Sequence, residues 1–475
     1  MSLDKSQNDW GWIKAKDFML FNPKESIKKG TVVKNVPMDK IEPKTKEIPS
    51  YELTEYKGGV KFRNGDILMA RITPCLENGK ISQVSILDYN EIGAGSTEFI
   101  VLREKEGISD KDFIYYLSNS EYFKEPAIKS MVGSSGRQRV QRDVVENLEI
   151  YVPPLETQKK IGKVLSFFDK KISLNKKINK NLEEQLLRIF DSWFLKFELS
   201  NEFSDSKLGL IPKGWKIDYL GSKKSCSIIK SGIDEFDNSK IYIATADVDN
   251  SIITSNDTLI TMDDKPSRAN MQPISNSIWF AKMIDSKKLI MVDEYCNDLL
   301  NNYIFSTGFC GLKCVDKYFY YLWTFLLTDV FDVMKNNFCT GTTMQAINNK
   351  DTKLIEFVLP DDKTITQFNS IAKPMFKKIY YNNLEIKKLQ RLRDALLPKL
   401  MSGEIDVSKI NCDLKIIIRK IYIKSSKLFL WRYLSENQNH IKNTKSNETL
   451  LKSRTIHKIN KFLAKFNARY RYYRQ

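Results

Sequence analysis

Residues 155–197 read LETQKKIGKVLSFFDKKISLNKKINKNLEEQLLRIFDSWFLKF, and this stretch decides the fold of the chain. It contains no proline, and no glycine follows Gly162. At 1.5 Å per residue, about forty residues make a rod of roughly 60 Å, which has to lie against another rod. Its seam residues recur at alternating steps of four and three, which is the spacing of a coiled coil: Ile161, Leu165, Phe168, Ile172, Asn175, Asn179, Leu182, Leu186, Ile189 and Trp193.

A second rod lies 207 positions further along the same chain. Asn175 then falls on Asn382, and a buried asparagine in a seam fixes the register at a cost in stability. Two unrelated amphipathic helices are the alternative interpretation, but the repeat extends well beyond the rods. The shifted seam consists of Phe368, Ala372, Met375, Ile379, Asn382, Ile386, Leu389, Arg393, Leu396 and Leu400.

The segments before the two rods also match each other, so the whole unit is duplicated. Residues 277–282 correspond to 66–71, and the Ser-Thr pair at 306 corresponds to the pair at 96. We predict an α+β fold with a pseudo-twofold internal repeat, in which two similar mixed α/β domains are joined by two long antiparallel coiled-coil helices. The predicted parts are the first domain at 1–154, the first helix at 155–200, the second domain at 208–360, the second helix at 363–405 and a basic C-terminal extension at 409–475.

Local signals predict several individual elements. Residues 110–124 are typical of a helix with Ser109 or Asp110 as its N-cap, and Pro126 is expected to end or kink it. The apolar run at 318–327 is too short for a membrane span and predicts a core helix. The other expectations are a loop leading into a strand over 93–103, a linker at 198–214, and a kink or delayed start at Pro374 in the second helix.

The net charge of +18 is concentrated at the C-terminal end of the chain. Residues 409–475 carry 17 Lys and Arg against 3 Asp and Glu, which leaves 59 basic and 55 acidic residues in 1–408. A nucleic-acid interface in the body must therefore rest on local patches. We interpret the tail as a partly disordered extension; an arm that contacts nucleic acid through arginines and tyrosines is the alternative.

The motifs of common catalytic sites are missing from the body of the chain. There is no phosphate-binding loop, no dinucleotide fingerprint and no nucleophile elbow, and the adenine methyltransferase motif Asn/Asp-Pro-Pro-Tyr/Phe is not found. The only two histidines, at 440 and 457, lie in the tail, and the seven cysteines are scattered. The body is therefore interpreted as a binding protein with no catalytic residue and no metal site. We expect a cytoplasmic protein with reduced thiols and no membrane contact.

Five strings carry a resemblance to a known family: GDILMARITPCLENGK at 65–80, GSTEFIVLR at 95–103, VPPLETQ at 152–158, LIPKGW at 210–215 and LLPKLMSGEI at 396–405. With the duplication, they make the chain similar to the specificity (S) subunits of type I restriction-modification systems over about 1–408. Members of that family usually end soon after the Ser-Gly-Glu-Ile string, so the extension departs from the pattern.

The resemblance implies two target-recognition domains, each of which reads one half of a split site in double-stranded DNA. The rods would act as a ruler between the half-sites and would help to dock methyltransferase (M) subunits, which restriction (R) subunits then join. It also implies that this chain has no catalysis and no cofactor of its own. S-adenosylmethionine, ATP and Mg are expected on the partner subunits.

Polar and basic residues on loops are the candidates for DNA contact, because they donate to phosphates and base edges. Shaping of the loops alone is the alternative for each of them. A coiled-coil scaffold with two protein-binding heads is the alternative function, and it predicts no salt-dependent DNA affinity. The candidates are Arg71, Thr73, Lys80, Ser96, Thr97, Arg137, Gln138 and Arg139 in the first domain, and Arg268, Asn270, Lys282, Lys287, Lys288, Thr342, Thr343 and Gln345 in the second.

Overall fold

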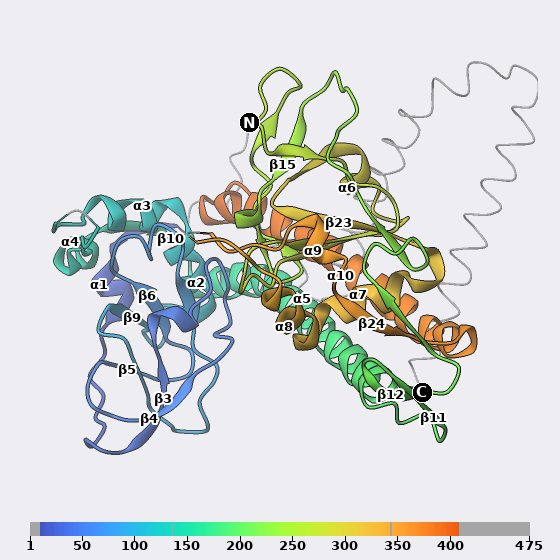
Figure 1. Cartoon of the computed structure of the whole chain (residues 1–475). Coiled ribbons are helices and arrows are strands. Elements are labelled where there is room, and N and C mark those ends of the chain that lie inside the picture. Colours follow the sequence, from blue (N-terminus) through green and yellow to red (C-terminus); the bar gives the residue numbers. More distant parts are fainter. Residues whose placement is uncertain (1–9, 135, 343, 408–475) are drawn as a thin grey trace, which may run out of the picture. The chain divides into compact units, whose positions relative to one another are not determined.

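The computed structural model describes residues 10–134, 136–342 and 344–407, so the predicted extension at 409–475 lies outside the described residues (Figure 1). The chain divides into two compact units. Unit 1 runs up to Phe167 and takes up the chain again at Arg393, whereas unit 2 is Phe168–Leu392. In the described part of the chain, no helix has the length and apolar character needed to cross a membrane.

Unit 1 contains two four-stranded sheets and a separate strand pair. The first sheet is antiparallel throughout, and the second contains one parallel pair, β3 with β8. The strand order of the first sheet is β2 (Met19–Phe21), β9 (Phe99–Glu104), β6 (Ile67–Ala70) and β7 (Ile81–Gln83). The order of the second sheet is β4 (Glu52–Glu55), β3 (Val32–Val36), β8 (Gly93–Gly95) and β5 (Val60–Phe62). The separate pair is β1 (Gly11–Lys14) with β10 (Glu149–Val152).

Unit 2 repeats this topology strand for strand, as the sequence duplication predicts. The second sheet again has a single parallel pair, β15 with β22, at the corresponding place. The sheets are β14 (Cys226–Ile228), β23 (Phe309–Cys314), β20 (Ser277–Ala281) and β21 (Leu289–Val292), then β18 (Leu259–Ile260), β15 (Lys240–Ile243), β22 (Tyr303–Ser306) and β19 (Ala269–Met271), with β13 (Lys216–Tyr219) paired to β24 (Glu356–Leu359). A small hairpin of β16 (Val248–Asp249) and β17 (Ile252–Ile253) adds to this plan.

The predicted helix after β9 is present, but it ends earlier than the sequence suggested. Asp110 caps α2 (Lys111–Asn119) by accepting a hydrogen bond from the Phe113 amide at 2.9 Å, as predicted. The chain then turns at Ser120, whose backbone is extended and whose hydroxyl donates to the Leu117 carbonyl at 2.6 Å. Pro126 lies inside the next helix, α3 (Glu121–Lys129), so Ser120 and not Pro126 separates the two helices.

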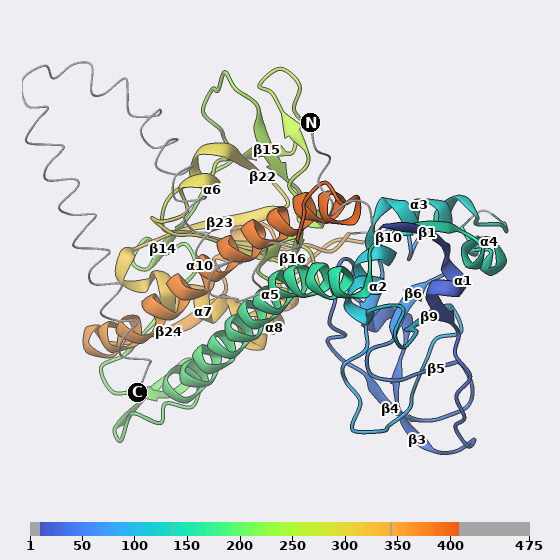
Figure 2. The same ribbon diagram turned by 180° about the vertical axis from the view of Figure 1, so that it is seen from behind.

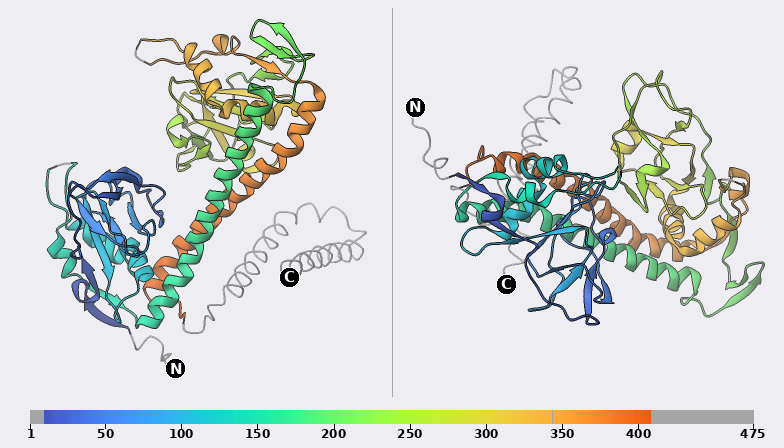
Figure 3. Two further views of the ribbon diagram at one scale, coloured as in Figure 1. Left: turned by 90° about the horizontal axis from the view of Figure 1, so that it is seen from below. Right: turned by 90° about the vertical axis from the view of Figure 1, so that its left-hand side faces the viewer.

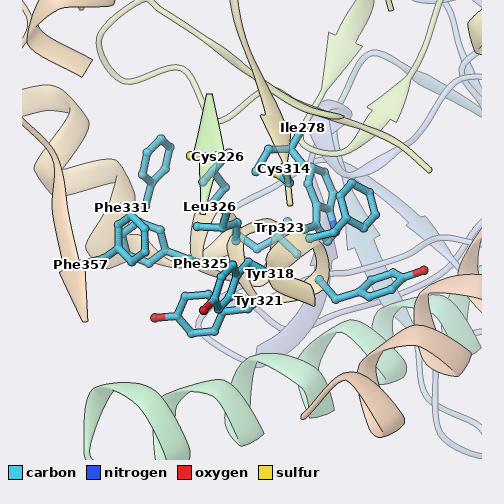
Figure 4. Close-up of a cluster of buried hydrophobic side chains, with 14 of the residues drawn as sticks. Cys226, Ile278, Cys314, Tyr318, Tyr321, Trp323, Phe325, Leu326, Phe331 and Phe357 are labelled. Carbon is cyan, nitrogen blue, oxygen red and sulfur yellow. The ribbon is translucent and has the colours of Figure 1, made fainter. Parts of the chain in front are cut away.

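The predicted core helix of unit 2 is confirmed as α7 (Phe319–Leu327), in which every side chain is buried. Figure 4 shows Phe331 and Phe357 gathered near Phe325 of this helix, and the Phe325 ring lies 5.7 Å from Phe331 and 5.5 Å from Phe357. Sheet β14-β23-β20-β21 and the two long helices contribute to the same cluster. A helix that is apolar on all sides is stable only when its whole surface is covered.

Both long helices are present. The first, α5 (Leu155–Phe190), ends in a π-helical turn at Asp191–Leu195, and the second is α10 (Asp362–Met401). Within unit 2 they lie side by side (Figures 2 and 3). They run antiparallel, because Asn179 contacts Asn382 whereas Phe190 lies beside Phe368. Pro374 does not delay α10, which begins twelve residues earlier at Asp362.

The predicted seam residues are buried or partly buried, and the centre of the seam in unit 2 is polar. Asn175 and Asn382 are each 1% exposed. Asn175 donates to a Glu385 carboxylate oxygen at 2.8 Å, and Asn382 donates to the Asn179 side-chain oxygen at 2.7 Å. Asn179 in turn donates to Asn383 at 2.8 Å. The seam therefore contains a hydrogen-bonded amide layer between apolar layers, which specifies register.

The start of α5 is tied to the domain of unit 1 by Gln158, which is 2% exposed. Its amide group donates to the carbonyls of Ile108 at 3.1 Å and Pro153 at 2.9 Å, and its oxygen accepts from the Asp110 amide at 3.0 Å. A Cβ at Gly162, one turn further, would lie 2.9 Å from the Asp112 side chain. The close approach of α2 to α5 therefore requires glycine there.

Two expectations for loops were wrong. Residues 198–214 contain a hairpin of β11 (Phe203–Ser206) and β12 (Gly209–Pro212), and are not a plain linker. Residues 93–95 form strand β8 and not a loop. A Cβ at Gly93 would lie 2.3 Å from the Phe62 ring, so the lack of a side chain at Gly93 lets this strand pack against Phe62.

Candidate nucleic-acid interface

Three loops of unit 1 meet beside the first sheet and bring several of the predicted residues together. They are the loop after β6, the turn before β9 and the loop 132–140. The Arg71 amide donates to the Glu98 carbonyl at 2.9 Å, and the Val140 amide donates to the Arg71 carbonyl at 2.9 Å. The Thr73 amide donates to the Gln138 carbonyl at 3.0 Å. This cluster, which we call the unit 1 loop cluster, thus contains Arg71, Thr73, Ser96, Thr97, Arg137, Gln138 and Arg139.

An ion pair lies at the centre of the unit 1 loop cluster. Arg139 donates Nε to both carboxylate oxygens of Glu98, at 3.1 and 3.0 Å, and Nη2 to one of them at 2.6 Å. These bonds hold the pKa of the Glu98 carboxyl below its ordinary value, although partial burial raises it. The Arg71 Nη2 lies 3.4 Å from the Val140 carbonyl, whereas its buried Nε has no partner among the described residues.

The loop 132–140 is closed at its base and exposed at its tip. The Val132 and Arg139 backbones exchange two hydrogen bonds of 3.0 Å. Gly133 has φ +143°, and a Cβ there would lie 3.0 Å from the Arg137 carbonyl, so glycine is required for this turn. Arg137 is exposed beyond the closure. The loop therefore presents a basic, solvent-exposed tip on a fixed base.

Unit 2 builds the same loop cluster from different residues. The Lys282 amide donates to the Gly308 carbonyl at 2.9 Å, as Arg71 does to Glu98. Thr340 and Ala346 exchange backbone hydrogen bonds of 3.2 and 3.1 Å, as Val132 and Arg139 do. We call this the unit 2 loop cluster.

The other predicted residues of the second domain divide between this cluster and the surface around it. The Arg268 carbonyl accepts from the Thr307 amide at 2.9 Å, and the Gln345 carbonyl accepts from the Ile284 amide at 3.0 Å. Asn270 lies near Arg268, on β19. Thr342 is exposed on the loop 340–346, and Thr343 lies outside the described residues.

All four predicted lysines direct their ammonium groups to protein atoms, and Lys282 donates to the Thr307 carbonyl at 3.2 Å. Lys80 donates to the Met38 carbonyl at 2.9 Å, and Lys288 donates to the Thr245 carbonyl at 2.7 Å. Lys287 forms an ion pair of 2.8 Å with Asp329, at the start of α8 (Asp329–Asn337). These lysines are therefore less available for an external partner than the loop residues are.

Glu98 was missed by sequence reasoning, which considered only cationic, amide and hydroxyl side chains. The available signal was its place in Ser96-Thr97-Glu98, where the second copy has glycine. Across 10–134, 136–342 and 344–407, no three His, Cys, Asp or Glu side chains are grouped as metal ligands would be.

Comparison with known proteins identifies the family. A family model described as the type I restriction modification DNA specificity domain matches residues 7–184. The specificity subunit of the type I restriction enzyme MjaIX of Methanocaldococcus jannaschii is 30% identical over 319 residues, which cover 64% of this chain and 71% of that protein. The chain belongs to the type I restriction enzyme specificity subunits.

Other relatives carry the same name. The HindI specificity subunit of Haemophilus influenzae is 23% identical over 410 residues, covering 72% of this chain and 87% of that protein. The crystal structure of a type I S subunit from M. genitalium superimposes with a TM-score of 0.49 at 16% identity, covering 84% of this chain and 98% of the other. The family assignment rests on the sequence relatives, and it agrees with the duplicated plan of this specificity subunit.

Proposed function

We propose that this specificity subunit reads a bipartite target in double-stranded DNA, with one half-site bound by the domain of unit 1 and the other by the domain of unit 2. The observation that carries the proposal is the repetition of one loop cluster in both units. Each cluster combines backbone closure with exposed basic or polar side chains, which are the groups that contact phosphates and base edges.

The residues proposed to contact DNA are those of the two loop clusters. Arg137 and Gln138 in unit 1, and Thr342 and Gln345 in unit 2, lie on the loops and have their side chains wholly or partly exposed. The four lysines remain candidates with a supporting role, since their ammonium groups already have protein acceptors: Lys80, Lys282, Lys287 and Lys288. The full proposed set is Arg71, Thr73, Lys80, Ser96, Thr97, Arg137, Gln138, Arg139, Arg268, Asn270, Lys282, Lys287, Lys288, Thr342, Thr343 and Gln345.

The two long helices are proposed to set the spacing of the half-sites and to help dock methyltransferase subunits. Their 36 and 40 residues correspond to lengths of roughly 54 and 60 Å. Successive major-groove faces of B-DNA repeat every ~34 Å, so helices of this length can span more than one turn. Methyl transfer and DNA cleavage would reside on methyltransferase and restriction partners in the cytoplasm, and this subunit would supply recognition.

The test is a genome-wide map of adenine methylation in the host with and without this gene. We expect one gapped, two-part motif to disappear on deletion. Charge reversal of Arg137 to glutamate should weaken methylation of that motif, because a cation near phosphates becomes an anion. Lys29 of unit 1, which is also exposed and lies outside the loop cluster and the long helices, serves as the control reversal. A map that does not change on deletion would contradict the proposal.

A binding assay separates DNA reading from a scaffold role. The purified complex should lose affinity for its target steeply as salt increases, because contacts to phosphates release counterions. An affinity for DNA that is absent, or that does not depend on salt, would favour a protein-binding scaffold.

A further inference from the structure

A carboxylate lies among the cations of the unit 1 loop cluster. Glu98 is held by the Nε and Nη2 groups of Arg139, and Arg71 lies close enough to lower the pKa of the Glu98 carboxyl further. An acidic side chain on a surface that meets phosphates is unfavourable unless it serves another group. Glu98 accepts hydrogen bonds from Arg139, so Arg139 is the group whose position it can fix.

The geometry of the pair leaves one edge of the guanidinium available. A guanidinium has five N–H donors in a planar fork. Glu98 occupies the side formed by Nε and Nη2, and Nη1 has no bond to Glu98. The outer edge, formed by Nη1 and the second N–H of Nη2, can therefore donate to a further acceptor. Two parallel donors are what the O6 and N7 atoms of guanine accept in the major groove.

The Arg139 backbone is also fixed on two sides. It pairs with Val132 across the base of the loop and forms a bridge with Ile72 after β6. With the side chain held by Glu98, both ends of the residue are constrained. Such preorganisation reduces the entropy lost when a long side chain binds.

We propose that Glu98 is a positioning residue that aims the outer edge of Arg139 at a guanine in the half-site read by unit 1. This inference rests on the proposed function and deepens it by naming a base-reading residue and its support. In this proposal Glu98 acts on the DNA through Arg139, which engages both of its oxygens.

The second unit lacks this pair at the equivalent positions. The bridges Ile72 to Arg139 and Val132 to Arg139 correspond to Met283 to Ala346 and Thr340 to Ala346. Ala346 thus stands where unit 1 has Arg139, and Gly308 stands where unit 1 has Glu98. The ion pair of Glu98 with Arg139 is present in unit 1 alone among the two equivalent sites, so its loss should alter recognition of only one half of the target.

A surface ion pair that merely stiffens the loop is the competing interpretation. The side chains of Arg139 and Glu98 are 46% and 26% exposed, and such pairs contribute little to stability. The chain offers a matched pair in the same unit, Arg142 with Glu146, whose side chains are 48% and 24% exposed. Glu146→Gln therefore removes an equivalent ion pair outside the loop cluster.

The experiment uses the full chain assembled with its methyltransferase partners and compares E98Q, R139A, the double variant and E146Q. Each complex is given a library of targets in which every base pair of both half-sites is varied. We expect R139A to lower discrimination for one G·C pair of one half-site by about 5- to 150-fold, which is the range for a bidentate contact. E98Q should lower it at the same base pair by a smaller factor.

The double variant should resemble R139A alone, because Glu98 acts through Arg139, and E146Q should match the wild type. The positioning role is overturned if E98Q changes a base pair that R139A does not, or if it leaves discrimination intact while R139A removes it. Base reading by Arg139 is overturned if R139A weakens all targets equally, as loss of a phosphate contact would. A wild-type complex with no sequence preference would instead overturn the proposed function itself.

Discussion

Replacing the buried amide Asn382 of the coiled-coil seam by leucine should make the helix pair more stable and less specific. Asn382 is 1% exposed, and it gives one hydrogen bond of 2.7 Å to Asn179. Leucine has the same number of side-chain heavy atoms and the same branching, so it fits with little overpacking. Burying it contributes about 1.5–3 kcal/mol, whereas a neutral hydrogen bond contributes about 0.5–1.5 kcal/mol.

The substitution leaves the Asn179 side-chain oxygen without its donor, but the free-energy cost of this loss is small. Asn179 is only half-buried and still donates to Asn383 at 2.8 Å, so its free oxygen can be hydrated. The net expectation for Asn382→Leu is a gain of about 0.5–2 kcal/mol in the free energy of opening of the helix pair. A buried asparagine excludes shifted registers, because they leave the amide unpaired. The variant should therefore tolerate targets with altered spacers more readily.

Hydrogen exchange measured by mass spectrometry reports the opening of the two helices directly. Peptides from 168–190 and 362–392 should exchange more slowly in Asn382→Leu than in the wild type. Ile386→Ala is the control, since it deletes a neighbouring seam side chain that is 8% exposed and should lower the opening free energy by about 2–4 kcal/mol. Faster exchange in Asn382→Leu would refute the reasoning, because it would mean that the amide layer is a net source of stability.

Three further predictions concern the units themselves. Arg103→Met should destabilise unit 1 by about 2–3 kcal/mol in chemical denaturation, because it leaves the buried Asp66 carboxylate without its bonds of 2.7 Å to Arg103; unchanged stability would contradict this. The hydrogen bond from Arg63 holds the pKa of Glu25 below its ordinary 4.5, so the stability it supplies is present above that pH and is lost as the pH falls, and Glu25→Gln should flatten the acid side of the stability profile. Burial raises the pKa of Cys226 to about 11, so peptide-resolved alkylation at pH 8 should label it only on unfolding, and rapid labelling in the folded chain would show that the site opens.

The duplicated frame could be predicted from the sequence because it rests on periodicity. A seam at steps of four and three and a fixed offset between copies are properties of the chain alone, and α5, α10 and the repeated sheets follow from them. The apolar run of α7 was equally direct, since such a helix has no stable place except a core. Burial of Asn175 and Asn382 followed from their place in the seam.

The errors arose where tertiary contacts override a local rule. Pro126 lies inside α3, and the break between α2 and α3 is made instead by the turn at Ser120. Residues 93–95 were interpreted as a loop leading into a strand, but they form β8, which needs glycine at 93 to pass the Phe62 ring. Long-range packing of this kind leaves no short-range signal.

The candidate site was predictable in its loops and not in its pairings. Arg71 and Arg139 could be named from their chemistry and position, and the structure brings their loops together. The ion pair of Lys287 with Asp329 depends on how β20–β21 meets α8, which no local pattern records. Glu98 was overlooked for the same reason, since its meaning comes from Arg139, 41 residues further along the chain.

The duplicated frame also explains how one chain can read two different half-sites. The turn before β9 and the turn before β23 are held by the same backbone bond, from Arg71 to Glu98 in unit 1 and from Lys282 to Gly308 in unit 2. Because that bond uses main-chain atoms, the residue that accepts it can be glutamate in unit 1 and glycine in unit 2 without altering the turn. Selection for a new target can then act on the loop side chains while the sheets and the seam stay as they are. We therefore expect that grafting Glu98 and Arg139 onto the positions of Gly308 and Ala346 would change base preference in the second half-site and leave the opening free energy of the helices unchanged, which the target library and hydrogen exchange can both measure.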